Sequence, residues 1–129
     1  MLNRITIMGR MTATPELRTT PGGSSVTSFT LAVERDFKDK ETGERPVDFI
    51  DCVAWNGPAE FITRFLSKGR MAVVNGSLQT RKYIDKDGNN RRTMEIKVDK
   101  AYFADSITGG NSQPEPQYEE LRNDEDLPF

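Results

Sequence analysis

Five segments of the chain carry the apolar and polar positions in the alternation that is typical of β-strands. They are residues 4–11, 25–33, 47–55, 71–84 and 91–103. Stretches rich in Gly, Pro, Asn and charged residues separate several of them, at 19–25, 39–46 and 85–90. The last of these stretches predicts that the fourth and fifth segments form a hairpin. The body of the chain is therefore predicted to be all-β.

One helix is expected between the third and fourth strands, in "GPAEFITRFLSKG". Pro58 falls in its first turn, where the missing N–H removes no hydrogen bond, and Gly69 offers a C-terminal stop. Its apolar positions form one stripe: Phe61, Ile62, Phe65 and Leu66. Five strands with a helix between the third and fourth match the order of an OB-fold, a five-stranded Greek-key barrel. Other small β-barrels show a similar pattern.

The composition changes at residue 106. The segment "SITGGNSQPEPQYEELRNDEDLPF" is rich in Gly, Pro, Gln, Asn and acids, and it lacks the apolar periodicity that offsets the entropy of ordering. We expect an OB-fold domain over residues 1–105 and a disordered acidic C-terminal tail. The tail divides into a flexible linker, 106–122, and a terminal tip, 123–129.

The charge follows the same division. The net charge is −2, yet residues 1–105 hold 17 Lys and Arg against 14 Asp and Glu, whereas residues 106–129 hold one Arg against six acids. A mildly basic body with an acidic tail suggests two partners of opposite charge, or a tail that competes for the body's own site. Ordinary surface charge with a solubilising tail explains the same numbers.

The sequence lacks most of the residue types and motifs that catalytic and metal sites require. The chain has no His and a single Cys, Cys52, and it contains neither a phosphate-binding P-loop nor a GxGxxG motif. We therefore expect no enzyme, no catalytic residues, no metal and no cofactor. An unpaired Cys, no membrane-spanning apolar run and a start too charged for a signal peptide favour the cytoplasm.

The third predicted strand, "VDFIDCVAW", carries two aromatic residues on one face. Ile50, Cys52 and Ala54 alternate onto the barrel interior, so Phe49 and Trp55 face the other way. The two rings are six positions apart, which is about 20 Å in a strand. Two aromatic plates at this spacing suit the stacking of bases several nucleotides apart on one strand.

Two more aromatic residues lie among cations in loop-like surroundings. Phe37 precedes Lys38, and Tyr83 follows Arg81 and Lys82. A single-strand binder needs this mixture, because any base stacks on an aromatic face and cations neutralise the phosphates. Further basic residues extend the predicted path: Arg4, Arg10, Arg18, Arg91 and Arg92.

Structural roles explain each of these residues when it is taken alone. Phe49 or Trp55 would pack against another subunit, Phe37 would brace a hairpin, and Tyr83 would serve a strand end. The nucleic-acid interpretation gains weight because the basic and aromatic pattern recurs in three separate segments.

The chain resembles the bacterial single-stranded DNA-binding protein family over essentially its whole length. The similar segments are "MLNRITIMGRMTATPELRTTPGG", "FTLAVERDFKDKETGE", "VDFIDCVAWNGPAEFITRFLSKG" and "VNGSLQTRKYIDKDGNNR". The resemblance implies an OB-fold that assembles as a homotetramer wrapped by DNA. It also implies that four aromatic residues stack bases and that nearby cations hold the backbone. These residues are Phe37, Phe49, Trp55 and Tyr83, with Arg4, Arg18, Lys38, Arg81 and Lys82.

The last residues, "DEDLPF", fit the family's C-terminal pattern of acids followed by an apolar residue, Pro and Phe. Such a tip is a linear docking motif, in which Phe129 fills an apolar pocket and its carboxylate pairs with a basic residue. Pro128 limits the conformations lost on binding, and the acids attract basic surfaces. The predicted partner-binding residues are Asp124, Glu125, Asp126, Leu127, Pro128 and Phe129. By resemblance, the partners are helicases, nucleases and recombination or replication proteins.

We therefore expect a non-enzymatic protein that binds and protects single-stranded DNA in replication, recombination and repair. We expect it in the cytoplasm, associated with the nucleoid. Two alternatives stay open. One is an OB-fold accessory protein whose main role is protein docking, and the other is an RNA-directed module of the cold-shock type.

Overall fold

A computed structural model describes residues 1–105 of the chain, so the predicted linker and tip lie outside the described residues. The described part contains strands β1 (Ile5–Met11), β2 (Arg18–Thr19), β3 (Ser25–Glu34), β4 (Val47–Trp55), β5 (Met71–Ile84) and β6 (Asn90–Phe103), and helix α1 (Asn56–Phe65). The five predicted strands and the helix are confirmed. The two-residue strand β2 was not predicted.

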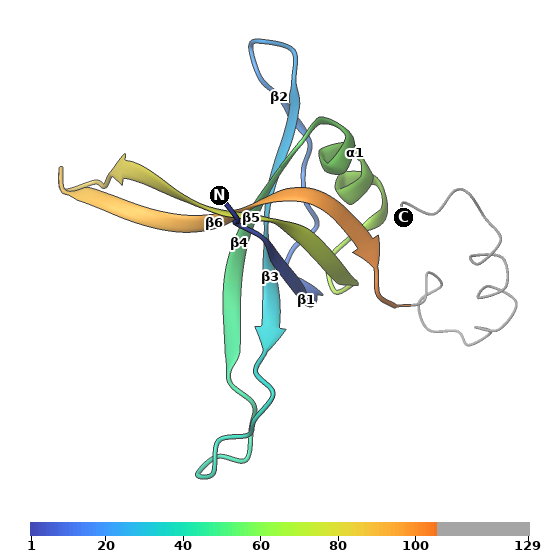
Figure 1. The fold of residues 1–129 in the computed structure, drawn as a ribbon, viewed down its shortest axis with the longest axis vertical. Coiled ribbons are helices and arrows are strands. Elements are labelled where there is room, and N and C mark those ends of the chain that lie inside the picture. The colour runs from blue at the N-terminus through green and yellow to red at the C-terminus, as the bar shows by residue number, and fades with distance from the viewer. Residues whose placement is uncertain (106–129) are drawn as a thin grey trace, which may run out of the picture.

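The strands close into an OB-fold barrel, as predicted (Figure 1). The sheet order is β1-β5-β6-β4-β3-β2, and an additional β1–β3 pairing joins the barrel's two ends. All pairs are antiparallel except β4–β6, where Cys52, Val53 and Ala54 pair in parallel with Ile96, Lys97 and Val98. The short β2 adds a flap to the start of β3, where Arg18 pairs with Val26.

The barrel core follows from strand alternation. Cys52 and Ala54 of β4 are buried, and Leu31 of β3 and Ile96 of β6 are fully enclosed. Each large apolar side chain buried in this way contributes about 1.5–3 kcal/mol. The interior assignment of Cys52 and Ala54 is thus confirmed, whereas Ile50, assigned with them, is only partly buried and packs against the core. The alternate residues of β4 are left on the outside of the barrel.

Helix α1 covers one end of the barrel and starts directly after β4. Asn56 takes a φ of 54° at this junction, a left-handed conformation that Asn tolerates better than most residues. Ile62 and Leu66 are fully buried, as the apolar stripe predicts. Phe65 differs from the prediction: it is 42 % exposed, because its ring lies at the rim and packs on Phe61 and Phe103 at centroid distances of 5.1 and 5.8 Å.

Two hairpin arms project from the barrel in different directions (Figure 1). The β3–β4 arm comprises residues 33–48, and the β5–β6 arm comprises residues 78–96. The β5–β6 ladder shifts register at Asn75 and Gly76, and a bulge of this kind bends a strand. Gly76 is required there, since an added Cβ would lie 2.0 Å from the Lys97 carbonyl oxygen. Within residues 1–105, no helix has the length and apolar character needed to cross a membrane.

Candidate nucleic-acid interface

The outer face of β4 presents the two predicted aromatic residues. Phe49 is 68 % exposed and Trp55 is 39 % exposed, and both alternate with the buried Cys52 and Ala54. Asp51 lies between them on the same face and accepts a hydrogen bond from Thr30 Oγ1 at 2.9 Å. The face therefore carries two aromatic plates with one carboxylate between them.

Strand register extends this outer face onto the β5–β6 arm. Val53 of β4 pairs with Lys97 of β6, and Lys97 pairs with Ser77 of β5, so these three residues share the outer side. Because alternate residues of a strand share a side, Arg81 and Tyr83 of β5 lie on the same side as Ser77. Tyr83 is 43 % exposed. The fold thus brings Phe49, Trp55 and Tyr83, from distant parts of the sequence, onto one outer face.

Cations on this part of the β5–β6 arm have carboxylate partners. The Arg81 guanidinium lies 5.9 Å from the centroid of the Tyr83 ring, and its Nε lies 3.4 Å from Glu95 Oε1. Arg91 Nε lies 2.8 Å from Asp85 Oδ2, and this hydrogen bond is the main reason that the pKa of Asp85 is lowered. The outer side of the arm is therefore close to charge balance.

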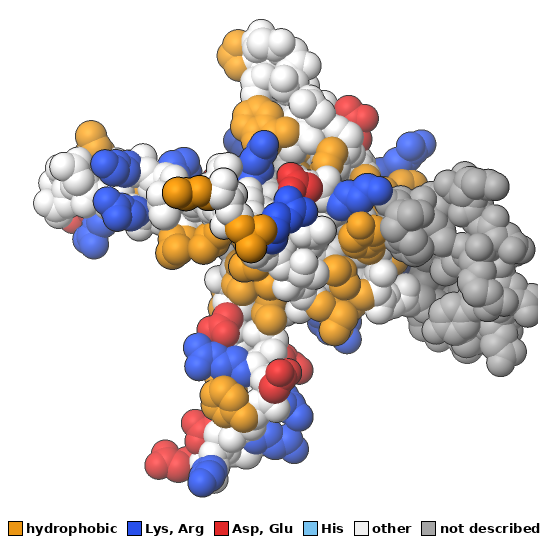
Figure 2. Space-filling view, viewed as in Figure 1, with side chains coloured by type: hydrophobic (Ala, Val, Ile, Leu, Met, Phe, Trp, Pro, Cys, Tyr) orange, Lys and Arg blue, Asp and Glu red, His pale blue; other side chains and the backbone are white. Residues whose placement is uncertain are grey.

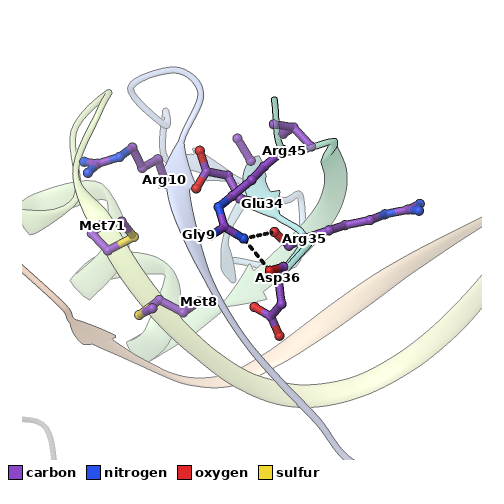
Figure 3. Close-up of a pocket in the computed structure, with 10 residues that line it drawn as sticks. Met8, Gly9, Arg10, Glu34, Arg35, Asp36, Arg45 and Met71 are labelled. Atoms are coloured by element: carbon purple, nitrogen blue, oxygen red, sulfur yellow. Dashed lines mark hydrogen bonds between the residues drawn. The ribbon is translucent and has the colours of Figure 1, made fainter. Parts of the chain in front are cut away.

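Phe37 projects from the β3–β4 arm and is 58 % exposed. The loop that carries it is held by polar contacts: Arg35 N donates to Pro46 O at 2.9 Å. The Arg45 guanidinium donates to the carbonyl oxygens of Arg35 and Asp36 (Figure 3). Arg45 thereby fixes the residues just before Phe37, next to a cavity of about 490 Å³ between β1 and the arm.

A bidentate ion pair braces the base of the same arm. Arg35 Nε and Nη2 each donate to an Asp48 carboxylate oxygen at 2.9 Å. The hydrogen bond from Arg35 lowers the pKa of Asp48, and the carboxylate in turn raises the pKa of Arg35. These contacts position Phe37 and Lys38 at the end of an ordered hairpin.

Two further predicted cations lie near the Trp55 end of the face. Arg18 pairs with Val26, and Val26 pairs with Trp55, so the three residues form one row across β2, β3 and β4. Arg4 Nη1 lies 2.8 Å from Asp99 Oδ2. Asp99 follows Val98 in β6, beside the end of β4, so Arg4 is near this end with its charge partly neutralised.

Lys82 departs from the grouping that the sequence suggested. Because neighbouring residues in a strand point to opposite faces, Lys82 lies on the side of the arm away from Arg81 and Tyr83. Its cross-strand partner is Arg92. Sequence reasoning also missed two exposed apolar residues of the arm, Ile84 at 70 % and Met94 at 55 % exposure. Continuing the strand alternation from Leu78 in β5 and from Ile96 in β6 would have placed them on the same side of the arm as Lys82.

Cys52 does not lie on this surface. Its thiol is buried in the barrel, and burial raises its pKa to about 12. Among residues 1–105, no three His, Cys, Asp or Glu side chains lie close enough together to hold a metal ion.

The comparison with known families assigns this chain. Residues 2–104 match the description "Single-strand binding protein family". The chain belongs to this family. Single-stranded DNA-binding protein A of Bacillus subtilis is 46 % identical over 112 residues, which is 87 % of this chain and 64 % of that protein.

Other relatives match similarly. Single-stranded DNA-binding protein 2 of Listeria innocua is 44 % identical over 124 residues, 92 % of this chain and 77 % of that protein. Single-stranded DNA-binding protein 1 of Staphylococcus aureus is 40 % identical over 123 residues, 95 % of this chain and 73 % of that protein. This member of the family therefore spans about two thirds to three quarters of the length of these relatives.

Proposed function

We propose that the chain binds single-stranded DNA without sequence preference. The names of its relatives state single-stranded DNA binding for those proteins. The observation that carries the proposal is the outer face on which Phe49, Trp55 and Tyr83 are all exposed. Base stacking on such rings contributes about 1–3 kcal/mol per base and tolerates every base. Phe37, on its braced arm, supplies a fourth ring.

Phosphate neutralisation supplies the remaining affinity. Arg4 and Arg18 flank the Trp55 end, Lys38 accompanies Phe37, and Arg81 accompanies Tyr83. When DNA binds, a phosphate competes with the carboxylate partner of Arg4 or Arg81. Each phosphate neutralised on a single strand releases counterions, so the affinity falls with salt by a slope of about −0.7 per contact.

The biological role that follows is protection of exposed strands in replication, recombination and repair, without catalysis. The domain is residues 1–105, the linker 106–122, and the tip 123–129 recruits genome-maintenance proteins through its acids and Phe129. This part of the proposal rests on the family resemblance and on the sequence of the tip. The same resemblance supports a cytoplasmic, nucleoid-associated homotetramer.

One exposed apolar residue of β1 marks a surface for assembly. Met8 is 56 % exposed and pairs with Val73 of β5, on the side of the strand away from the barrel interior, between the polar Thr6 and Arg10. A second copy of the chain would cover Met8, and sedimentation of the full chain tests whether the chain assembles.

The primary test is a titration of oligo-dT against the fluorescence of Trp55, the single Trp of the chain. Tight, salt-dependent binding with quenching supports the proposal and places Trp55 at the DNA. Binding without quenching keeps the function but removes Trp55 from the site. Failure to bind in a gel shift overturns the function and favours the protein-docking alternative, and a preference for oligo-U in competition favours the RNA-directed one.

A further inference from the structure

Three phenylalanine rings cluster where α1 meets the end of β6. Phe61 and Phe65 lie one turn apart on α1, and Phe103 is the last residue of β6. The ring centroid of Phe61 lies 5.1 Å from that of Phe65 and 5.4 Å from that of Phe103, and the Phe65 and Phe103 centroids lie 5.8 Å apart. Phe65 is 42 % exposed, and Phe61 and Phe103 are partly buried against the core. The cluster therefore presents aromatic surface to solvent at this end of the barrel.

A depression with a mostly apolar lining continues the cluster along the junction of α1 and β6. Its volume is about 260 Å³, and Phe61 belongs to both features. Figure 2 shows basic side chains beside hydrophobic ones on the side of the barrel where α1 lies. Exposed apolar surface rimmed by polar residues is typical of an interaction site. We call the whole surface the α1 groove, and its apolar residues are Pro58, Phe61, Phe65, Ala101 and Phe103.

Arg64 supplies a cation at the edge of the α1 groove. Its guanidinium lies 5.5 Å from the centroid of the Phe65 ring. It forms no ion pair with any residue in 1–105. Glu60, one turn earlier on α1, instead accepts a hydrogen bond from Ser25 Oγ at 3.3 Å. A carboxylate brought to this edge would therefore find a cation that no described acid neutralises.

The described part of the chain ends directly beside the same cluster. Asp105 is its last residue, and the carboxylate oxygens accept hydrogen bonds from Arg70 Nε and Met71 N, each at 3.1 Å. The Arg70 guanidinium lies 5.4 Å from the centroid of the Phe103 ring. These contacts anchor the point from which residues 106–129 continue, next to the α1 groove.

One segment of the remaining chain has side chains that suit this surface. Residues 118–121 read "YEEL", so two apolar side chains flank two carboxylates. Tyr118 and Leu121 can cover the rings of the groove while one of the carboxylates reaches Arg64. The tip, 123–129, has three acids and a terminal carboxylate beside its apolar residues. That is more negative charge than a single arginine complements, which favours residues 118–121 as the occupant.

The segment is within reach of the groove. Residues 106–117 form a tether of 12 residues between Asp105 and the segment. A flexible chain of this length has a root-mean-square end-to-end distance of about 20 Å. Helix α1, with 10 residues, is about 15 Å long. A tether whose mean length matches the span gives an effective concentration of about 1 mM, so even a weak site is occupied.

We propose that residues 118–121 dock on the α1 groove of their own chain, with both apolar side chains on the three rings and a carboxylate on Arg64. The docked segment closes residues 106–117 into a loop and leaves only a short lead to the tip. The eight residues from the docked segment to Phe129 span at most about 28 Å, so the tip is presented from the α1 end of the barrel. The inference concerns this presentation and does not depend on DNA binding.

A second copy of the chain is the competing occupant, and charge disfavours it. In a symmetric dimer the α1 groove would meet itself, so Arg64 would face its own equivalent. The acidic segment of the same chain avoids this repulsion and is held nearby by the tether.

The test is chymotryptic cleavage of the full chain after Tyr118, with the released C-terminal fragment followed by mass spectrometry. A free peptide of residues 112–124 gives the intrinsic cleavage rate. With an effective concentration of about 1 mM and a Kd of about 0.2 mM, we expect cleavage of the full chain to be about sixfold slower than that of the peptide.

Variants of the body test the groove itself. Arg64→Glu reverses the unpaired cation, and we expect the cleavage rate to return to nearly that of the peptide. Lys86→Glu makes the same charge change in the turn of the β5–β6 arm, which points away from α1, and should keep the wild-type rate (Figure 1). The charge exchange Arg64→Glu/Glu119→Lys/Glu120→Lys should restore the protection, measured against a peptide with the same two lysines. Thermal melting checks that each variant is folded.

Variants of the tail leave residues 1–105 unchanged and test the occupant. In amide NMR spectra of the full chain, Tyr118→Ser/Leu121→Ser should shift the resonances of α1 and of the end of β6, because the ring of Tyr118 leaves the groove. Leu127→Ser/Phe129→Ser, the matched change in the tip, should leave those resonances in place.

The outcomes are distinct. Cleavage of wild type at the rate of the peptide refutes the docking, and so does protection that Arg64→Glu leaves intact. Shifts at α1 in Leu127→Ser/Phe129→Ser, without shifts in Tyr118→Ser/Leu121→Ser, assign the groove to the tip and refute the choice of segment. Protection that rises with protein concentration assigns the groove to a second molecule and refutes docking within one chain. A chain that fails to bind oligo-dT loses the proposed function and leaves this inference standing on its own results.

Discussion

Truncation of Phe49 separates a role in stacking from a role in folding. The Phe49 ring is 68 % exposed on β4, so about a third of its surface is buried and Phe49→Ala should cost the free energy of unfolding at most about 1 kcal/mol. The loss of one stacked base weakens binding by about 1–3 kcal/mol, which is about a 5- to 140-fold rise in Kd. Trp55 remains as the fluorescent reporter, so titration with oligo-dT at fixed salt measures the change.

Phe65→Ala is the matched control, because it removes the same ring from a half-exposed position on α1. Phe65 packs on Phe61 and Phe103, and each aromatic pair contributes about 0.5–1.5 kcal/mol to stability. We expect this variant to melt earlier and to bind oligo-dT as wild type does. The reasoning is refuted if Phe49→Ala keeps the wild-type Kd, or if Phe65→Ala weakens binding equally.

Three further substitutions test the fold and the charges of the interface. Gly76→Ala places a Cβ against the Lys97 carbonyl, and we expect a loss of about 1–3 kcal/mol, measured by chemical denaturation. Asp48→Asn removes the carboxylate whose pKa Arg35 lowers. The stability that this carboxylate adds is present above the ordinary Asp pKa of about 4 and is lost as the pH falls through the lowered pKa. The Tm difference from wild type should therefore shrink on acidification. Asp51→Asn removes the carboxylate between the two aromatic plates. For a DNA phosphate roughly 6 Å from this carboxylate, loss of the repulsion should raise the affinity for oligo-dT about threefold at low salt.

Each of the three substitutions has a control or an outcome that would contradict its argument. Gly57→Ala is the control for Gly76→Ala, since no atom lies within 4 Å of its added Cβ, and a similar loss in both would contradict the steric argument. A Tm difference for Asp48→Asn that grows on acidification would contradict the sign of the pKa argument. The gain from Asp51→Asn should fade as salt screens the charge, and a salt-independent gain would assign the effect to another cause.

The barrel was predictable because its signals are local. Alternation in β4 identified Cys52 and Ala54 as interior residues and left Phe49 and Trp55 outside, and the burial of each confirms this. The helix followed from the periodicity at Ile62, although it ends at Phe65, four residues before the stop expected at Gly69. These features need only the repeat of a strand or a helix, which a single sequence displays.

Long-range pairing was not predictable in the same way. The β1–β3 contact that closes the barrel requires Gly9, since a Cβ there would lie 2.7 Å from the Ala32 carbonyl oxygen. Nothing near Gly9 in the sequence identifies Ala32 as its neighbour. The role of Arg45 was equally hidden, because an arginine that donates to backbone carbonyls in its own hairpin resembles any exposed cation in sequence.

The division of the cations was within reach of the sequence, yet grouping residues by proximity along the chain concealed it. Arg81 and Lys82 are adjacent in sequence and were assigned together, but adjacency in a strand means opposite faces. The bulge at Gly76 bends the strand, so that the first half of β5 belongs to the barrel and the second half forms the free arm. A residue on the inward side of β5 is buried in the barrel, whereas a residue four positions further along, on the same side of the strand, is in solvent. The outer part of the arm can therefore carry charged residues on both sides, since neither side packs on the barrel core there.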